Sequence, residues 1–461
     1  GTNRRQRQMC IRDRSRALPR RSRTVAIVTG CLRCRMPPSV ALSLQKPSWT
    51  ATVDETRLGK SLEIMAAIGL QNDGSVKRLA FSDEDLQARS LFIDWLKAAG
   101  ASVRIDPAGN LIGRIEGSEP GLPALVTGSH LDTVPTGGRF DGALGVLAGL
   151  EVMRSLKDQA ISLRHPLEVV VFADEESTMV GCKGMTGVAS ANPADYTCSN
   201  GNSITNNLPV IEGSWDHLPE ARRCDTDIAA FLELHVEQGG ILENRGDAIG
   251  LVEGVVGQRR FLVRVEGMAN HAGTTPMDAR QDALATAAQV ILAVQDLAAN
   301  YPGEPVGTVG KLQLWPNAAN VVPGQVEMSI DLRDLSIEVL NDLVEELEAR
   351  LNSISRASGC PISLMPQFSV DPTPAHLSVT EAIAASTQTL GLSCSALPSR
   401  ASHDSQEMGR RWPMGMIFVP SRGGFSHSAA EFTSERQCAD GTAVLMQSLV
   451  RLDQRLNRVR G

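Results

Sequence analysis

An imidazole and two carboxylates lie within one Gly-rich stretch at residues 124–145, which reads ALVTGSHLDTVPTGGRFDGALG. Neutral imidazole and carboxylate oxygen are good ligands for a divalent transition ion, so His130 and Asp141 are candidate metal ligands. Asp132 lies two residues after His130, close enough for its carboxylate to accept the other ring N–H and fix the tautomer. The stretch alone is equally compatible with a polar loop whose aspartates are turn residues.

Three adjacent acids, Asp174, Glu175 and Glu176, follow the apolar run LEVVVFA at residues 167–173. Carboxylates at the end of a buried strand repel one another unless a cation or hydrogen-bond donors neutralise them, although a surface turn would relieve the repulsion equally well. If this strand lies beside the one that leads to His130, the two glutamates can have different roles in one site. One can ligate a metal while its neighbour accepts a proton.

Two more histidines follow or end apolar runs. The run FLELHV at residues 231–236 contains His235 and is followed by Gln238, and His427 follows a glycine pair in RGGFSHSAAEFT at residues 422–433. A histidine on an alternating strand is more often a core residue than a ligand. The position of His235 at a strand's carboxyl end favours a site, because ligands of α/β proteins bind there.

The strands and helices expected to hold these residues show two kinds of hydrophobic pattern, one typical of parallel strands and one typical of antiparallel strands. The first two apolar runs, separated by a helical spacing that starts at Gly142, predict two parallel strands joined by a helix. Residues 259–266 alternate strictly, which indicates a half-exposed antiparallel strand, and two long helices follow. We predict an α/β fold with a mixed, mostly parallel sheet flanked by helices, and an inserted α+β unit of the split β-α-β, ferredoxin-like type. The larger domain is expected over residues 51–255 and 371–461 and the inserted unit over residues 256–370.

The composition is typical of a soluble globular protein, with 42% hydrophobic and 21% charged residues. At 461 residues the chain is too long for one ordinary core, and no run reaches about 18 apolar residues, so we expect no membrane partner. The nine cysteines show no zinc-type spacing apart from Cys31 and Cys34. Free thiols indicate a reducing compartment, and we expect a cytoplasmic protein.

Residues 1–50 differ from the rest, because they carry eleven Arg and one Lys against one acid, Asp13. Removing their net charge of +11 from the overall −7 leaves −18 for the remainder, and an acidic body argues against nucleic acid as a partner. An Arg-rich, acid-poor leader is compatible with a transit peptide. We favour an artefactual or disordered extension outside the fold, with a native start near Met36.

Five blocks, in order, resemble the hydantoinase/carbamoylase branch of the dinuclear-metal aminoacylase and peptidase superfamily, over residues from about 55 to the end. The blocks are GSHLDTVPTGGRFDGALG, FADEE, ELHVEQGGILE, MANHAGTTPM with the later PNAANVVPG and DLR, and GFSHSAAEFT. That branch contains N-carbamoyl-L-amino acid amidohydrolases, allantoate amidohydrolases and β-ureidopropionases. The resemblance implies a two-metal catalytic domain and a smaller domain that mediates homodimerisation and closes as a lid.

The resemblance implies that one divalent ion is held by His130 and His235 and the other by Glu176 and His427, with Asp141 bridging them. Two neighbouring cations need such a shared anionic ligand, and a water held between them becomes a nucleophile at neutral pH. Imidazoles and carboxylates accept Zn²⁺, Mn²⁺, Co²⁺ or Ni²⁺, so the identity of the metal stays open.

The resemblance also implies three catalytic roles. Glu175, adjacent to the ligand Glu176 but not itself a ligand, would accept the proton of the attacking water and pass it to the leaving nitrogen. Asp132 would orient His130. His271, in MANHAG, would stabilise the developing oxyanion.

Substrate contacts come from several blocks. The resemblance implies that Asn320 and Arg333 bind the substrate carboxylate, with Gln238, His271 and His403 as further contacts. Without the resemblance, Arg333 in the sequence Asp-Leu-Arg is more typical of a strand-end charge paired with the nearby aspartate.

Two segments depart from the family pattern. Residues Ser177–Gly181 read Ser-Thr-Met-Val-Gly where Gly-Ser-Arg-Phe-Gly is usual, and Ser402–Ser405 read Ser-His-Asp-Ser where Gly-His-Asp-Ala is expected. All implied ligands and the implied base are present, so we expect hydrolysis to be intact. The departures bear on substrate selectivity.

We therefore expect a metal-dependent amidohydrolase that cleaves the carbamoyl C–N bond of N-carbamoyl-L-amino acids, which are small ureido substrates with a carboxylate. Allantoate amidohydrolase and β-ureidopropionase are the nearest alternatives, because pocket shape rather than the ligand set separates them. A peptidase is less expected, since His235 stands where peptidase relatives commonly have an acid. The alternative from another class is a catalytically silent binding protein of the same fold, which would lack a ligand or the base.

Overall fold

The computed structural model describes residues 49–456. The chain divides into two units, residues 1–47 and 48–461, and the described residues belong to the second. The predicted extension at residues 1–50 therefore lies outside the described residues, apart from Trp49 and Thr50.

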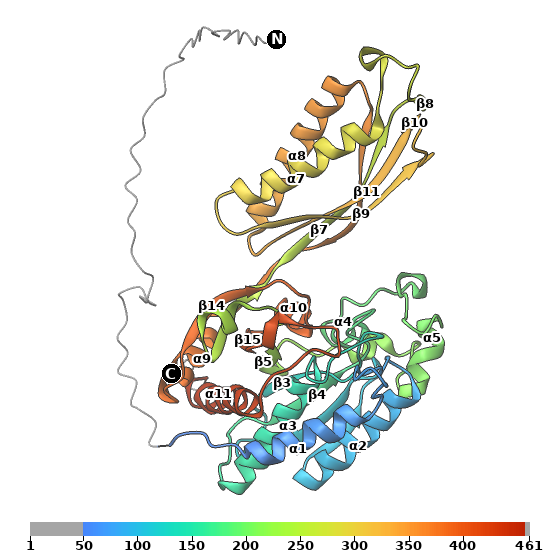
Figure 1. Ribbon diagram of the computed structural model, residues 1–461. Coiled ribbons are helices and arrows are strands. Elements are labelled where there is room, and N and C mark those ends of the chain that lie inside the picture. The colour runs from blue at the N-terminus through green and yellow to red at the C-terminus, as the bar shows by residue number, and fades with distance from the viewer. Residues whose placement is uncertain (1–48, 457–461) are drawn as a thin grey trace, which may run out of the picture. The chain divides into compact units, whose positions relative to one another are not determined.

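A nine-stranded mixed sheet forms the centre of the larger domain (Figure 1). Its strands are β1 (Ser102–Ile105), β2 (Leu111–Ile115), β3 (Ala124–His130), β4 (Leu167–Phe172), β5 (Ile228–Val236), β6 (Ile249–Val255), β13 (Thr373–Pro374), β14 (Cys394–Ser399) and β15 (Met414–Val419). The four central strands lie in the order β4-β3-β5-β15 and are parallel, whereas β1, β2 and β13 pair antiparallel with their neighbours. The predicted parallel pair is confirmed, with His130 of β3 opposite Phe172 of β4.

Two apolar cores form on the two faces of this sheet, which explains why its central strands read as continuous apolar runs. Val169 and Val171 of β4 are buried in one core, and Val170 and Phe172 in the other. The first core also contains the helices α1 (Glu55–Ala67), α2 (Asp83–Ala99), α3 (Ala143–Asp158), α9 (Leu377–Thr389) and α11 (Glu435–Arg455). The second is covered by α4 (Val180–Thr186) and α10 (Asp404–Met408). Two short helices, α5 (Ile204–Asn207) and α6 (Ile241–Arg245), lie in the connections on either side of β5.

The long helices start and stop at local signals. The side chain of Ser82 accepts the backbone N–H of Asp85 and caps α2, which ends at Gly100 with a left-handed φ of 94°. Ser434 and Gln437 form a capping box at the start of α11. Because α11 packs against α1 and α3, the last helix joins the first part of the chain to the sheet.

Residues 257–370 form a separate antiparallel sheet with two helices. Its strands are β7 (Gly257–Glu266), β9 (Val306–Trp315), β11 (Gln325–Asp334) and β12 (Ile362–Val370), in the order β12-β7-β11-β9. The helices α7 (Ala283–Asn300) and α8 (Ile337–Ser358) pack against it around Val290, Leu343 and Leu347 (Figure 1). This is the β-α-β-β-α-β order of the predicted unit. A two-stranded ribbon of β8 (Asn270–His271) and β10 (Val321–Val322) extends from it.

Within residues 49–456, α7 is the one helix long and apolar enough to cross a membrane by length and composition. A core helix passes the same test, and Val290, Val294 and Leu297 of α7 are buried against the sheet of residues 257–370. Packing against the sheet therefore explains the apolar side chains on the inner face of α7.

Candidate metal centre

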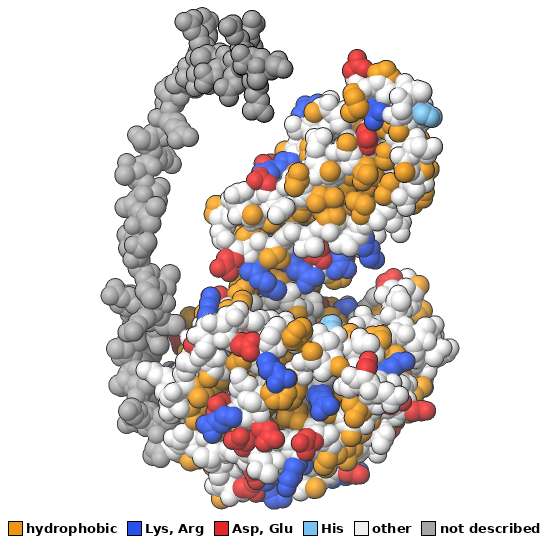
Figure 2. Space-filling model, viewed as in Figure 1, with side chains coloured by type: hydrophobic (Ala, Val, Ile, Leu, Met, Phe, Trp, Pro, Cys, Tyr) orange, Lys and Arg blue, Asp and Glu red, His pale blue; other side chains and the backbone are white. Residues whose placement is uncertain are grey.

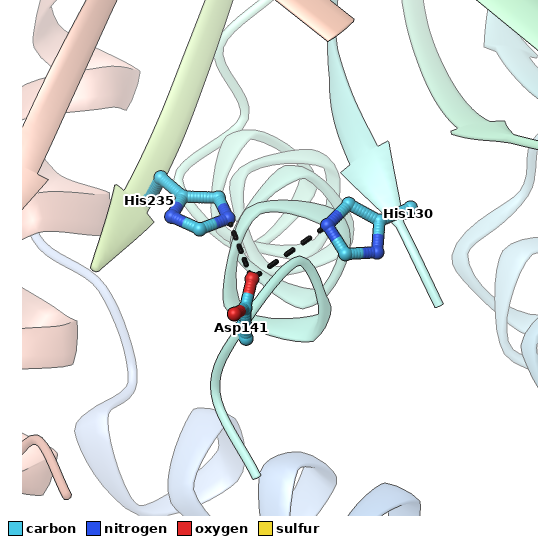
Figure 3. A group of neighbouring side chains, drawn as sticks. All are labelled: His130, Asp141 and His235. Carbon is cyan, nitrogen blue, oxygen red and sulfur yellow. Dashed lines mark ion pairs between the residues drawn. The ribbon is translucent and has the colours of Figure 1, made fainter. Parts of the chain in front are cut away.

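The two carboxylate oxygens of Asp141 face two different groups of side chains. Oδ1 lies 3.1 Å from Nε2 of His235 and 3.7 Å from Nε2 of His130 (Figure 3). Oδ2 lies 3.2 Å from Nε2 of His427, which lies 3.8 Å from a carboxylate oxygen of Glu176. We call His130, His235 and Oδ1 of Asp141 the strand-side triad, and Glu176, His427 and Oδ2 of Asp141 the loop-side triad.

Different elements hold the two triads. His130 and His235 end the neighbouring strands β3 and β5, and their side chains are 3% and 1% exposed. Glu176 follows β4, and His427 lies in the loop after β15 with its side chain 49% exposed. Sheet hydrogen bonds therefore fix the strand-side histidines, whereas the loop-side triad depends on how two loops are held.

Both strand-side imidazoles have the tautomer that a metal ligand requires. Nδ1 of His130 lies 2.9 Å from the main-chain oxygen of Asp132, and Nδ1 of His235 lies 2.9 Å from that of Val236. Each Nδ1–H donates to a carbonyl, so Nε2 is the ring nitrogen that faces Asp141 and becomes a ligand once its proton is displaced. The carboxylate of Asp132, predicted to take this proton, lies 3.8 Å from Nδ1 of His130, so the main-chain oxygen of the same residue makes the shorter contact. The carboxylate also accepts the N–H of Glu176 at 3.2 Å.

Gly142 lets the loop of Asp141 approach both histidines. Its φ is 64°, and its N–H donates to Nε2 of His235 at 3.1 Å. A Cβ at this position would lie 2.4 Å from Cε1 of His130. Any side chain here would therefore push the His130 ring out of place, and only glycine accepts this backbone without strain.

Burial and mutual charge shift the pKa values of these groups. Burial acts to raise the pKa of Asp141, but hydrogen bonds from His235 and His427 hold it well below its usual range. Burial lowers the pKa of His235, but Asp141 outweighs this effect and raises it to about 9, and the hydrogen bond to Asp141 raises the pKa of His427 to about 9. Burial raises the pKa of Glu176 to about 7. Protons and cations therefore compete for the same atoms.

The donor set fits two divalent transition ions. Each triad offers imidazole nitrogen and carboxylate oxygen, which Zn²⁺, Mn²⁺, Co²⁺ and Ni²⁺ all accept. The ligand atoms of each triad lie within 4.8 Å of one another. One ion in each triad would take the place of the protons that the histidines and Glu176 otherwise hold.

Glu175 lies beside the centre but belongs to neither triad. Its carboxylate lies 3.6 Å from Nε2 of His130, and the side chain is buried. Burial, reinforced by Asp404 and Glu176, raises the pKa of Glu175 well above its usual range. A carboxyl group of this kind is free to exchange a proton, which is the role predicted for it.

Two predicted substrate contacts, Gln238 and His403, lie at the centre. Gln238 donates from Nε2 to Oδ2 of Asp141 at 2.8 Å. The ring of His403 packs edge-on against that of His235, with centroids 4.5 Å apart, and burial lowers the pKa of His403 well below its usual value. His403 is therefore a neutral ring on the inner side of the strand-side triad.

Sequence reasoning missed two buried glutamates that support the centre. Glu431 accepts the N–H of Phe140 at 2.8 Å and of Asp141 at 3.1 Å. Glu233 on β5 accepts the hydroxyl of Ser405 at 2.6 Å, where the family pattern expects alanine. The available signals were an acid four residues after the loop-side histidine and an acid inside an apolar strand.

The predicted contacts in residues 257–370 do not lie together. His271 is exposed on the β8–β10 ribbon, where the N–H of Ala272 donates to the main-chain oxygen of Asn320 at 2.9 Å. Asn320 therefore lies beyond the Gln325 end of β11, and the strand from Gln325 to Arg333 spans roughly 26 Å. The prediction that Asn320 and Arg333 hold one carboxylate is not met within a single chain, because they lie at opposite ends of a strand.

Arg333 takes the pairing expected from its sequence neighbours. Nε lies 3.0 Å from Oδ1 of Asp331, and Nη1 donates to the main-chain oxygen of Arg400 at 2.7 Å. Asp331 also accepts hydrogen bonds from Arg260 at 3.0 Å and Gln258 at 2.6 Å. Asp331 therefore has two donors besides Arg333.

The sequence matches the family model described as peptidase family M20/M25/M40 over residues 126–451. It is 37% identical over 403 residues to an N-carbamoyl-L-amino acid amidohydrolase of Geobacillus stearothermophilus, covering 86% of this chain and 98% of that protein. It is also 37% identical over 396 residues to an allantoate amidohydrolase of Bacillus subtilis (strain 168), covering 85% and 96%. The fold is similar to that of an amidase of the hydantoinase/carbamoylase family from Burkholderia multivorans, with a TM-score of 0.82, 34% identity and coverage of 87% and 98%.

Metal uptake by the chelator-treated protein is expected to release protons at pH 7, and the affinity is expected to rise as the pH rises towards 9. The pKa values of His235 and His427, about 9, lie above the usual 6.5, so at pH 7 a cation must displace a proton from each. Calorimetric titration in two buffers of different ionisation enthalpy measures the protons released per ion. An affinity that does not change between pH 6.5 and 9 would contradict these shifts.

Proposed function

The chain belongs to the peptidase family M20/M25/M40, in its hydantoinase/carbamoylase group, and from this premise we propose that it hydrolyses the carbamoyl C–N bond of N-carbamoyl-L-amino acids at a two-ion centre. Membership confirms the resemblance carried by the five sequence blocks. The protein is a hydrolase of C–N bonds in carbamoyl or ureido compounds. The observation that carries the finer proposal is that the oxygens of Asp141 face two ligand pairs beside Glu175, a buried carboxyl group outside both.

Glu175 is the proton carrier of the proposed reaction. When bound, two divalent ions supply an acidified water and polarise the carbonyl oxygen of the substrate. Glu175 takes the proton of the attacking water and delivers it to the leaving nitrogen, which departs as a neutral amine. The burial that raises its pKa lets Glu175 hold the proton between the two transfers.

His271 has the tautomer that can donate a hydrogen bond to an oxyanion. Its Nδ1 accepts the N–H groups of Gly273 at 3.0 Å and Thr274 at 3.2 Å. The ring proton is therefore on Nε2, and the side chain is exposed. An exposed N–H donor on a projecting ribbon supports the proposed contact with the developing negative charge.

Arg333 is proposed to bind the substrate carboxylate with its two-pronged guanidinium group. Its side chain lines a cavity of about 790 Å³ on the open face of the small sheet, together with Arg260, Lys311 and Arg400. This excess of cations over the one acid, Asp331, favours a ligand that carries a negative charge. Arg260 and Gln258 satisfy Asp331 when Arg333 leaves it.

Allantoate is the second candidate substrate, because the allantoate amidohydrolase of Bacillus subtilis is as similar to this chain as the carbamoyl-amino-acid enzyme. The altered segment after Glu176 bears on the choice between the two substrates. Ser177 contacts the hydroxyl of Ser199, and the hydroxyl of Thr178 donates to Asp174 at 2.6 Å. Met179 and Val180 stand where the family pattern has arginine and phenylalanine, so the segment has lost a charge and an aromatic ring that could distinguish between ureido substrates.

We also propose a homodimer through residues 257–370. β9 is an edge strand with exposed Leu312 and Trp315, and the outer face of α7 exposes Leu292, so hydrophobic side chains gather on this unit (Figure 2). Antiparallel pairing of the β9 edges of two copies would cover these side chains. It would also bring the ribbon that carries Asn320 of one copy beside the Arg333 end of the other copy's sheet.

Substitution Glu175→Gln is expected to lower kcat by about 10²- to 10⁴-fold while the protein still binds two ions, because the amide keeps the size of the side chain but accepts no proton. The measurements are ammonia release and metal content of the purified variant. Near-normal turnover would remove Glu175 from its proposed role.

A substrate panel tests the assignment directly. We expect the highest kcat/KM with N-carbamoyl-L-amino acids and lower values with N-carbamoyl-β-alanine and allantoate. In the variant Arg333→Lys we expect KM to rise roughly 10-fold, because lysine lacks the guanidinium fork that binds a carboxylate. Rates of ammonia release are compared after loading with Zn²⁺, Mn²⁺, Co²⁺ and Ni²⁺. A higher kcat/KM for allantoate would make allantoate the substrate without contradicting the proposed two-ion centre. No turnover of any compound in the panel would reject the assignment to ureido substrates.

The wild-type protein should sediment as a dimer, and Leu292→Glu combined with Leu312→Glu should shift it towards monomer, because two charges would be buried in the interface. Leu377→Glu is the matched control, since Leu377 on α9 is 71% exposed but lies outside residues 257–370. A wild-type monomer, or a dimer unaffected by the double change, would contradict the proposed interface.

A further inference from the structure

Glu431 joins the two loops that carry Asp141 and His427. Its buried carboxylate accepts the N–H groups of Phe140 and Asp141 on Oε1, at 2.8 and 3.1 Å. Oε2 lies 3.5 Å from the hydroxyl of Ser426, which also donates to Oδ2 of Asp141 at 3.2 Å. The two loops lie 290 positions apart in the chain, so a tertiary contact of this kind sets their spacing.

The loop of Asp141 has a space for this carboxylate. A Cβ at Gly138 would lie 2.0 to 2.3 Å from the carboxylate atoms of Glu431. The other loop is closed at its base by the hydrogen bond from the N–H of Arg422 to the carbonyl of Phe432, at 2.9 Å. Because Phe432 directly follows Glu431, a shift of Glu431 would move both the closed loop and His427 within it.

The strand-side triad needs no such link. His130 pairs with Phe172 of β4 and His235 pairs with Phe418 of β15, and these parallel ladders hold the two histidines whether or not the loops are joined. Oδ1 of Asp141 then reaches them through the local backbone at Gly142. Only the loop-side triad requires that two independent loops keep a fixed distance.

We infer that Glu431 is a positioning residue that holds the loop-side triad together, so that binding of one of the two ions depends on it and binding of the other does not. The inference rests on the proposed two-ion centre. Supporting carboxylates outside the ligand set typically change metal affinity by about 10- to 100-fold. We therefore expect the wild type to bind both ions with similar affinity and the Glu431 variants to bind one ion more weakly than the other.

The test is a metal-binding isotherm for wild type, Glu431→Gln, Glu431→Ala and Gly138→Ala, measured with Mn²⁺ against a competing chelator. We expect two ions per wild-type chain, and in Glu431→Ala one ion of near wild-type affinity and a second about 100-fold weaker. Glu431→Gln should show a smaller split, because one acceptor oxygen remains. Gly138→Ala, which displaces the carboxylate without removing it, should show the same pattern. Electron paramagnetic resonance gives a second readout, since the signal of a coupled manganese pair should give way to that of isolated ions.

Asp453→Asn is the matched control. Asp453 is a buried carboxylate that accepts two successive backbone N–H groups, those of Arg164 and His165 at 2.9 Å each, from a segment 288 positions away. Asp453 lies on α11 and holds the segment just before β4, at the end of that strand opposite the centre, so this variant should lose stability without losing the second ion.

The outcomes separate the two hypotheses. Equal weakening of both ions in the Glu431 variants, or unchanged binding of both, would overturn the role of Glu431 while leaving the two-ion centre in place. Fewer than two ions in the wild type would instead overturn the proposed function. If Glu431→Ala does not fold, Glu431→Gln still tests whether binding of the second ion depends on Glu431, because this substitution preserves the size and shape of the side chain.

Discussion

One carboxylate, that of Asp141, faces two groups of ligands at once, and the surrounding structure follows from this requirement. Its loop approaches the strand-side histidines so closely that a side chain at Gly142 would displace the ring of His130. Its second oxygen meets His427, which comes from a loop far along the chain. The backbone at Gly142 therefore brings Asp141 to the strand-side histidines, and the bonds of Glu431 join its loop to the loop of His427.

Concentrating acids at the end of a buried sheet is unfavourable unless opposite charge is supplied. Asp141, Glu175 and Glu176 all lie in this region, and the pKa values of the two glutamates are raised by burial. The parallel order β4-β3-β5 brings these acids and the two strand-side histidines to one edge. The same electrostatic conflict that makes the site unfavourable for the bare chain makes it a candidate site for divalent ions.

Residues 257–370 place their polar groups at two separate ends. His271 and Asn320 lie on the ribbon, whereas Arg333 lies at the opposite end of β11 beside Asp331. Antiparallel pairing of two copies is the simplest arrangement that would bring these groups near one another. Asp331 is shared between Arg260 and Arg333, so it would keep a charged partner if Arg333 bound the substrate carboxylate as proposed.

Patterns local in the sequence determined most of the elements, and the family resemblance supplied the candidate ligands. Apolar runs predicted β3, β4 and β5, Ser82 and Gly100 marked the ends of α2, and the ordered blocks named the histidines and acids that the structure brings to Asp141. Only the tertiary structure decided that the main chain of Asp132 holds His130, that Glu431 joins two loops, and that Asn320 and Arg333 lie apart within one chain. Periodicity and capping depend on neighbours within a few residues, whereas these three features depend on side-chain direction and on distances between segments that meet only after folding.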